Sequence, residues 1–262
     1  MADVSEVVLV VPAFEPGTAL VGLVNRLKRD FRHVIVVDDG SRGASKVFAA
    51  LFGLEGVKVL THKSNRGKGA ALKTGFKEAL RLYPQAPGVV TVDADGQHLP
   101  EDVVRVAEAL LANPTRLIVG TRAFSGRIPF RSRLGNLWTR LEFRLLTGVS
   151  VRDTQSGLRG IPRQLLPRLM GIGGNRYDYE IRVLADCAIR LGAPVEIPIT
   201  TVYVDGNRSS HYRPLADTWS TQRALFAARH SSGLRGRRVP EGGSLECRGD
   251  TSVERRVQQL LF

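Results

Sequence analysis

Two aspartates end a short apolar run in the sequence TVDADGQH, residues 91–98. Asp93 and Asp95 are two residues apart, so an extended backbone would point both carboxylates to the same side. Two adjacent carboxylates repel each other unless a cation lies between them. Oxygen ligands with no cysteine nearby suit Mg²⁺ or Mn²⁺, which completes its coordination with phosphate and water. The pair therefore predicts a metal site for a phosphate-bearing molecule, where Gln97 could add a contact and His98 either adds one or only leads into the next helix.

Polar residues also follow three other apolar runs, in PAFEP (12–16), DDGS (38–41) and HKSNRGKG (62–69). Each alone would pass for an ordinary turn, because Asp, Gly, Ser and Asn are common turn residues. Four such ends in succession are harder to explain by turn chemistry. Ligands of open α/β sheets bind beyond the carboxyl ends of the strands, so we expect these segments to line one site.

Hydrophobic periodicity indicates the elements that position these residues. Short β-branched runs alternate with helical patterns, which is typical of an α/β fold with a mostly parallel sheet flanked by helices. We expect the third helix to bury Val103, Val104, Ala107 and Leu111. The expected strands are 7–11, 34–37, 57–60, 89–92 and 117–120, and the expected helices are 18–31, 68–83 and one from about 100 to 113.

The pattern changes after residue 121. An arginine-rich loop is followed by an expected helix around 133–146, the loop RDTQSGLRG (152–160), a helix after YDYE (177–180) and an alternating strand, VEIPITTVYV (195–204). We interpret this half as an extension of the same sheet, within one domain of residues 1–230. Residues 231–262 are rich in Gly, Ser and Arg with little apolar periodicity, which predicts a flexible tail.

Composition narrows the class of protein. The chain has 262 residues, 43% of them hydrophobic, and 38 Lys plus Arg against 25 Asp plus Glu, a net charge of +13. This charge favours an anionic partner. Two cysteines, Cys187 and Cys247, are too few for a disulfide framework or a cysteine metal site. No apolar leader and no run of about 18 apolar residues occurs. We therefore expect a cytoplasmic protein whose membrane contact is peripheral.

Six motifs then carry a family resemblance: VPAFE, VVDDGS, NRGKGAALKTG, DADGQH, TQSGLRG and YDYEI, in this order. Together they resemble the inverting family 2 glycosyltransferases of the GT-A fold, and more narrowly the polyprenyl-phosphate (dolichyl-phosphate) mannose and glucose synthases. The resemblance spans roughly residues 7–213. It implies a Rossmann-like sheet with a donor half of about 1–121 and an acceptor half of about 122–230.

The resemblance also implies site residues. The metal bridging the donor diphosphate would bind Asp93 and Asp95, with Gln97 as a possible third ligand. Arginines would face the acceptor phosphate, and Asp95, Arg122, Asp153 and Arg159 would be the catalytic candidates. The implied donor-binding residues are Pro12, Ala13, Glu15, Asp38, Asp39, Arg66, Lys68, Asp93, Ala94 and Asp95. The implied acceptor-phosphate residues are Arg122, Arg131, Arg133 and Arg159. Arg208 lies in a stretch that departs from the family's pattern, in a polar, cationic cluster that could either close over phosphate or solvate a turn.

The expected reaction is transfer of a hexose from a UDP- or GDP-sugar to a polyprenyl phosphate. Negative charge develops on the leaving diphosphate, which a metal and nearby cations stabilise. Inversion follows if the acceptor attacks in one displacement. A phosphate acceptor is already largely anionic, with a second pKa of about 6, and needs mainly arginines to place it. A hydroxyl acceptor would need a general base, for which Asp153, Asp178 and Glu180 are candidates.

Three alternatives stay open. The arginine-rich segment 120–148 is either a core-facing amphipathic helix with a solvated cationic face or an interfacial element that meets anionic headgroups at the cytoplasmic face of a membrane. The acceptor could instead be hydrophilic, for a glycosyltransferase or a nucleotidyltransferase. A nucleic-acid-binding module is the remotest alternative, because no recognition motif is present and acidic strand ends would repel phosphate, so we expect no nucleic acid partner.

Overall fold

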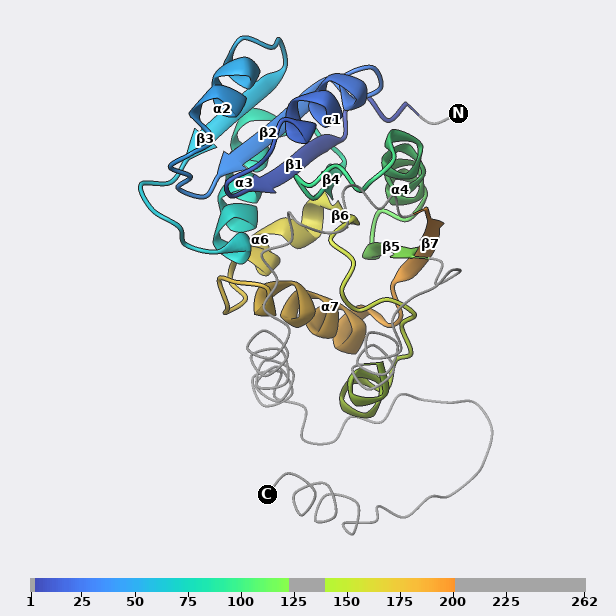
Figure 1. Cartoon of the computed structure of the whole chain (residues 1–262). Helices are drawn as coiled ribbons and strands as arrows, with labels where there is room; N and C mark the ends of the chain where they lie inside the picture. The colour runs from blue at the N-terminus through green and yellow to red at the C-terminus, as the bar shows by residue number, and fades with distance from the viewer. Residues whose placement is uncertain (1–2, 123–139, 201–262) are drawn as a thin grey trace, which may run out of the picture. The chain divides into compact units, whose positions relative to one another are not determined.

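The computed structural model describes residues 3–122 and 140–200, which form a mixed seven-stranded sheet in the order β3-β2-β1-β4-β6-β5-β7 (Figure 1). All neighbouring strands in this part of the chain are parallel except β6, which runs antiparallel to β4 and β5. This confirms the mostly parallel α/β sheet. The strands are β1 (Val8–Ala13), β2 (His33–Asp38), β3 (Val57–Thr61), β4 (Gly88–Thr91), β5 (Ile118–Arg122), β6 (Arg159–Pro162) and β7 (Val195–Ile199).

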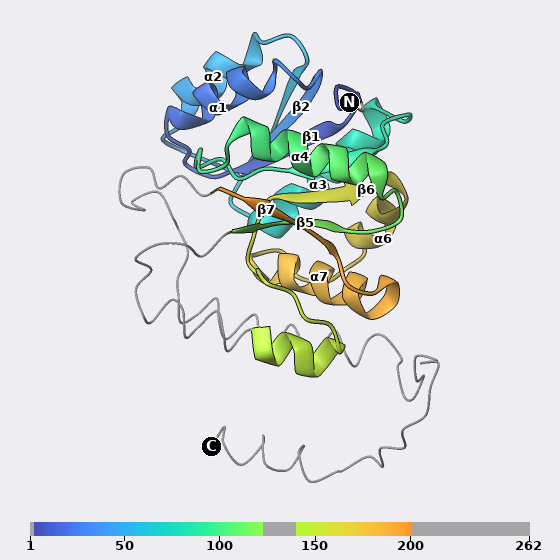
Figure 2. The ribbon, with the colours of Figure 1, turned by 90° about the vertical axis from the view of Figure 1, so that its right-hand side faces the viewer.

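Helices cover both faces of the sheet (Figures 1 and 2). One layer contains α1 (Ala19–Leu27), α2 (Ser45–Phe52) and α4 (Pro100–Ala112), and the other contains α3 (Lys68–Leu82), α6 (Leu166–Met170) and α7 (Asp178–Leu191). Strand residues alternate between the layers, so that in β1 Val8 and Val10 join one hydrophobic core while Leu9 and Val11 join the other. Burial on both faces explains why β1, β2 and β4 are largely apolar runs.

Three details differ from the sequence-based expectations. The helix α4 buries Val106 and Leu110 instead of Val104 and Leu111, and it also buries Asp102, which is 1% exposed and accepts a hydrogen bond of 2.8 Å from the amide of Thr200. The YDYE motif does not precede a helix, because α7 already begins at Asp178. The end of the expected TQSGLRG loop is a strand, β6, whose residues pair with both β4 and β5.

Several expectations lie outside the described residues. They concern Arg131, Arg133, Arg208, Cys247, the tail and the first half of the helix expected around 133–146. Residues 140–147 are described and helical. The domain limits therefore stay a prediction. Within the described ranges, no helix is both long and apolar enough to cross a lipid bilayer.

Candidate active site

The candidate site lies at the edge of the sheet where the carboxyl ends of the parallel strands β1 to β5 lie. Because β6 is antiparallel to its neighbours, its amino end reaches the same edge of the sheet. The residues expected from four separate segments of the sequence are therefore brought to one edge, together with the TQSG residues that precede β6.

The loops after β1 and β2 are tied together by Glu15. Its carboxylate accepts hydrogen bonds from the amides of Arg42 (2.6 Å) and Gly43 (3.0 Å), and its own amide donates to Ser41 Oγ over 2.8 Å. Glu15 adopts a positive φ of 47°, which is uncommon for a residue with a side chain. Pro12 and Ala13 end β1 just before this loop, paired with residues of β2.

Asp38 and Asp39 are both buried and mainly organise the backbone. Asp38 accepts a hydrogen bond of 2.8 Å from the Ser41 amide. Asp39 accepts from the amides of Arg66 (2.9 Å) and Gly67 (2.7 Å), and lies 2.7 Å from Nδ1 of His62. These bonds hold the loop that leads into α3, so Asp39 fixes the shape of this loop.

Lys68, the first residue of α3, joins two carboxylates from distant parts of the chain. Its Nζ atom lies 2.7 Å from Asp93 Oδ1 and 2.8 Å from Glu180 Oε2. It also lies over the ring of Tyr177, 5.9 Å from the ring centroid. Burial disfavours the charged ammonium, but the two carboxylates outweigh it and raise the pKa of Lys68 above its ordinary value.

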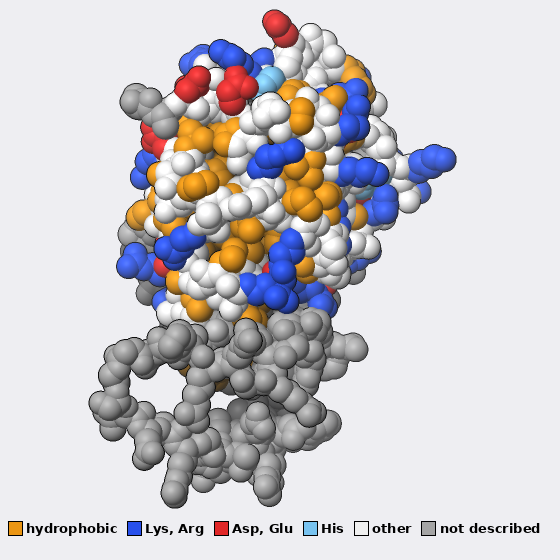
Figure 3. Space-filling model, turned by 180° about the vertical axis from the view of Figure 1, so that it is seen from behind, with side chains coloured by type: hydrophobic (Ala, Val, Ile, Leu, Met, Phe, Trp, Pro, Cys, Tyr) orange, Lys and Arg blue, Asp and Glu red, His pale blue; other side chains and the backbone are white. Residues whose placement is uncertain are grey.

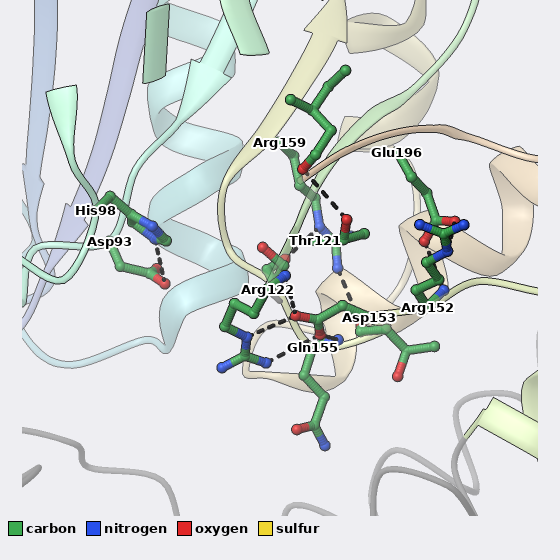
Figure 4. Close-up of polar contacts among 12 residues, drawn as sticks. Asp93, His98, Thr121, Arg122, Arg152, Asp153, Gln155, Arg159 and Glu196 are labelled. Carbon is green, nitrogen blue, oxygen red and sulfur yellow. Dashed lines mark hydrogen bonds and ion pairs between the residues drawn. The ribbon is translucent and has the colours of Figure 1, made fainter. Parts of the chain in front are cut away.

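Asp93 is closely enclosed. A Cβ atom at Gly157 would lie 2.3 Å from Asp93 Oδ2, so only glycine permits this approach. The Nε2 atom of His98 lies 3.5 Å from the same oxygen, Asp93 Oδ2 (Figure 4). Burial alone would raise the pKa of Asp93, but Lys68 and His98 hold it well below its usual range. The glycine of the TQSG motif therefore has a structural role beside the metal-ligand candidate.

The pKa of Asp95 is shifted in the opposite direction to that of Asp93. Its Oδ1 accepts a hydrogen bond of 3.0 Å from the Gln97 amide, which closes a short turn. Burial and the neighbouring charge of Asp93 raise the pKa of Asp95. The structure thus places two carboxylates at the end of β4, and within residues 3–122 and 140–200 only Asp93 forms an ion pair with a cation.

Arg122 and Asp153 form a second pair, apart from Asp93 and His98 (Figure 4). The guanidinium of Arg122 donates two hydrogen bonds to the carboxylate, Nε to Oδ2 over 2.7 Å and Nη2 to Oδ1 over 3.0 Å. Asp153 is fully buried. Although burial opposes ionisation, this arginine holds the pKa of Asp153 below its ordinary value.

Arg159 is buried and bonded within the fold. Its side chain is 2% exposed, and its guanidinium donates to the carbonyl oxygens of Ser156 (2.9 Å), Glu180 (2.5 Å) and Thr154 (3.4 Å). The side chain therefore fastens the TQSG residues to α7. In this geometry the guanidinium is bonded to backbone carbonyl oxygens of the chain itself.

Sequence reasoning missed two features of this site. It considered Glu180 only as a base, whereas Glu180 pairs with Lys68, and it assigned no role to Gly157. Both residues lie in motifs that were noticed, TQSGLRG and YDYEI. Their contacts could not be read from the sequence, because each partner lies more than sixty residues away along the chain.

Comparisons with known proteins place this geometry in a family. The chain is 30% identical over 230 residues to the UDP-N-acetylglucosamine–dolichyl-phosphate N-acetylglucosaminyltransferase of Methanococcus voltae, covering 78% of this chain and 88% of that one. It is 33% identical over 178 residues to the polyprenol monophosphomannose synthase of Mycolicibacterium smegmatis, covering 64% of this chain and 66% of the relative.

The fold has solved neighbours. Glucosyl-3-phosphoglycerate synthase of Mycobacterium tuberculosis, crystallised with Mn²⁺, UDP and glucosyl-3-phosphoglycerate, superposes with a TM-score of 0.63 at 20% identity, covering 86% of this chain and 78% of that one. The expected GT-A fold is therefore confirmed. The model of glycosyl transferase family 2 matches residues 8–169. Since this match covers more than half of the chain, the protein is a glycosyltransferase and belongs to family 2.

Proposed function

We propose that this glycosyltransferase moves a hexose from a nucleotide-sugar donor to a polyprenyl phosphate, with inversion and with the help of Mg²⁺ or Mn²⁺. One observation carries the choice of acceptor. Each of the three carboxylates considered as a general base is engaged by a cation: Asp153 by Arg122, Asp178 by Arg182 and Glu180 by Lys68. A hydroxyl acceptor needs a carboxylate that can take a proton, whereas a phosphate does not.

The names of the two relatives support the same choice. One transfers N-acetylglucosamine to dolichyl phosphate, and the other makes polyprenol monophosphomannose. Arg122, together with Arg131, Arg133 and Arg208, remains a candidate for the acceptor phosphate. Arg159 would support the acceptor side indirectly, through the loop that it holds.

The residues at the end of β4 fit a divalent cation. Burial and like charge raise the pKa of Asp95, which is the electrostatic cost that a cation would remove. The described residues contain no group of three or more His, Cys, Asp or Glu arranged to hold a metal. Asp93, Asp95 and Gln97 would therefore hold it with substrate phosphate and water as further ligands, as is usual for Mg²⁺. When bound, the cation would neutralise the leaving diphosphate.

The donor would bind along the loops after β1, β2 and β3. Glu15, Asp38 and Asp39 fix the backbone of these loops, and Arg66 carries an exposed side chain beside them. We assign Pro12, Ala13 and these residues to the nucleoside, and Lys68 to the phosphate side. Ala94 would line the site between the two metal-ligand candidates.

The protein would meet its lipid substrate by peripheral contact at the cytoplasmic face of the membrane. In the helical residues 140–147, Leu141 and Leu145 are 50% and 65% exposed, while Phe143 is buried. The nucleic-acid alternative is disfavoured. On the face drawn in Figure 3, Lys and Arg side chains are dispersed among hydrophobic ones and do not form a continuous stripe.

The test supplies a short polyprenyl phosphate and, separately, the corresponding free polyprenol, each with radiolabelled UDP- and GDP-hexoses in the presence and absence of Mn²⁺. We expect Mn²⁺-dependent transfer to the phosphate only. Comparable transfer to the free alcohol or to a water-soluble acceptor would refute the lipid-phosphate assignment. Transfer that is indifferent to Mn²⁺ and to chelators would refute the metal.

A further inference from the structure

We propose that Lys68 is an internal counter-ion of Asp93 that competes with the divalent cation, so that the cation binds Asp93 only when Lys68 is displaced. This inference rests on the metal site of the proposed function. It adds that, without nucleotide, the chain keeps that site closed with its own ammonium group.

The surroundings of the Asp93 carboxylate carry the argument. Lys68 Nζ lies 2.7 Å from Oδ1, His98 Nε2 lies 3.5 Å from Oδ2, and the backbone of Gly157 packs against both oxygens so tightly that a Cβ there would lie 2.3 and 2.6 Å from them. A Mg²⁺ ion binds carboxylate oxygens at about 2.0–2.1 Å. An ion at that distance from Oδ1 would lie beside the ammonium of Lys68, and two positive charges on one oxygen would repel each other.

Lys68 is the group best able to move. Gly157 belongs to the backbone that precedes β6, where its carbonyl accepts a hydrogen bond of 2.7 Å from Thr91 Oγ1, and His98 is only 8% exposed. Lys68 has a long flexible side chain and a second anionic partner, Glu180, at 2.8 Å. The ammonium can therefore leave Asp93 and remain paired.

The surroundings of Lys68 also explain why displacement of Lys68 would favour nucleotide binding. One oxygen of its partner Glu180, Oε1, is buried without a hydrogen-bond partner among the described residues. A lysine released from Asp93 at this place would lie at the amino end of α3, close to where a diphosphate must approach the metal. A diphosphate would thus supply Lys68 with a new counter-ion while the metal takes Asp93, and the two ligands would assist each other's binding.

The experiment measures Mn²⁺ binding to the nucleotide-free full-length protein, by the loss of the electron paramagnetic resonance signal of free Mn²⁺. We expect weak binding in the wild type and binding tighter by about tenfold or more in Lys68→Met, the order expected when a neighbouring charge is removed. The matched control is Lys77→Met, which removes the same charge from an exposed position of the same helix and should leave the affinity unchanged.

A second variant separates competition from a simple gain of negative charge. In Lys68→Met, Glu180 loses its partner and could attract the ion by itself, so the double variant Lys68→Met, Glu180→Gln removes both charges. Tighter Mn²⁺ binding in this double variant than in the wild type supports competition at Asp93. Unchanged or weaker binding in both variants, with native circular dichroism, overturns the inference.

The same Mn²⁺ titration, repeated with UDP present, distinguishes failure of this inference from failure of the proposed function. If wild type and variants bind Mn²⁺ equally, and only with UDP, the metal site stands and the competition by Lys68 is refuted. If no variant binds Mn²⁺ even with UDP, both are refuted.

Discussion

At the scale of single residues, the site depends on how closely the backbone of Gly157 approaches the Asp93 carboxylate. Gly157→Ala would place a methyl group 2.3 Å from Asp93 Oδ2, where one of the two must move. We expect Mn²⁺ affinity and turnover to fall by about tenfold or more, since a ligand shifted by an ångström loses its geometry, with only modest loss of stability.

The control for this change is Gly22→Ala in α1, where a Cβ meets nothing within 4 Å. Alanine in a helix interior should stabilise the fold by about 0.5–1 kcal/mol without changing turnover. Equal activity of Gly157→Ala and Gly22→Ala would contradict the role of Gly157. Turnover, Mn²⁺ titration and urea denaturation are the measurements.

Asp153 gives a pH-dependent prediction. Its pKa is lowered in the folded protein, so the stability from its pair with Arg122 is present above the unfolded pKa of about 3.9 and is lost as the pH falls through the folded value. Asp153→Asn should cost about 1–3 kcal/mol at neutral pH, discounted because Arg122 is partly exposed.

The difference in free energy of unfolding between wild type and Asp153→Asn should therefore shrink as the pH falls below the unfolded pKa of about 3.9 and through the lower folded pKa. Urea denaturation at several pH values measures it. A difference that does not change with pH would show that the pair contributes no charge-dependent stability.

At the scale of elements, Arg159 holds the TQSG residues against α7. Arg159→Lys should destabilise the fold by about 2–3 kcal/mol, because one ammonium cannot serve three buried carbonyl oxygens as the planar guanidinium does. The alternative, a grip on the acceptor phosphate, predicts a raised KM for the acceptor with unchanged stability. Denaturation and acceptor titration, run on the same protein, distinguish the two.

The strands β1, β2, β4 and β5 could be predicted from sequence because each contains an apolar run buried on both faces, and the edge strand β3 could be predicted from its β-branched residues. The strand β6 could not, since four residues, Arg159 to Pro162, with a glycine among them, carry no strand signal, and their pairing with β4 depends on a partner about seventy residues away. The face of α4 was misread for a similar reason. Asp102 is buried because it bonds the end of β7, a contact that periodicity does not contain.

For the site, residue types indicated segments that meet at one edge of the sheet, but they did not indicate the partners of the individual side chains. The pairs of Lys68 with Glu180 and of Arg122 with Asp153 join segments that lie apart in the sequence and meet only in the folded chain. Arginine in a TxSGxR motif suggested a phosphate contact, and only the buried guanidinium with three carbonyl partners shows its structural use.

At the scale of the whole molecule, the net charge of +13 bears on membrane contact. We expect the protein to sediment with vesicles that contain anionic lipid, much less with neutral ones, and to be released as salt rises, since the Debye length falls to about 3 Å at 1 M. Leu141→Ser with Leu145→Ser should weaken this binding while donor binding is unchanged. Binding that is equal for neutral and anionic vesicles would contradict the electrostatic contribution.

The antiparallel strand β6 has a consequence for how such enzymes can diversify. Since β5 ends and β6 begins at the same edge of the sheet, the chain between residues 122 and 159 leaves and returns at neighbouring points. Its length and composition before Asp153 can therefore change without shifting the register of any strand, while Asp153 and Gly157 keep their contacts with Arg122 and Asp93. Exchanging this segment between relatives, while the residues of β4 and α3 stay in place, should redirect the enzyme to another acceptor and leave its choice of nucleotide intact.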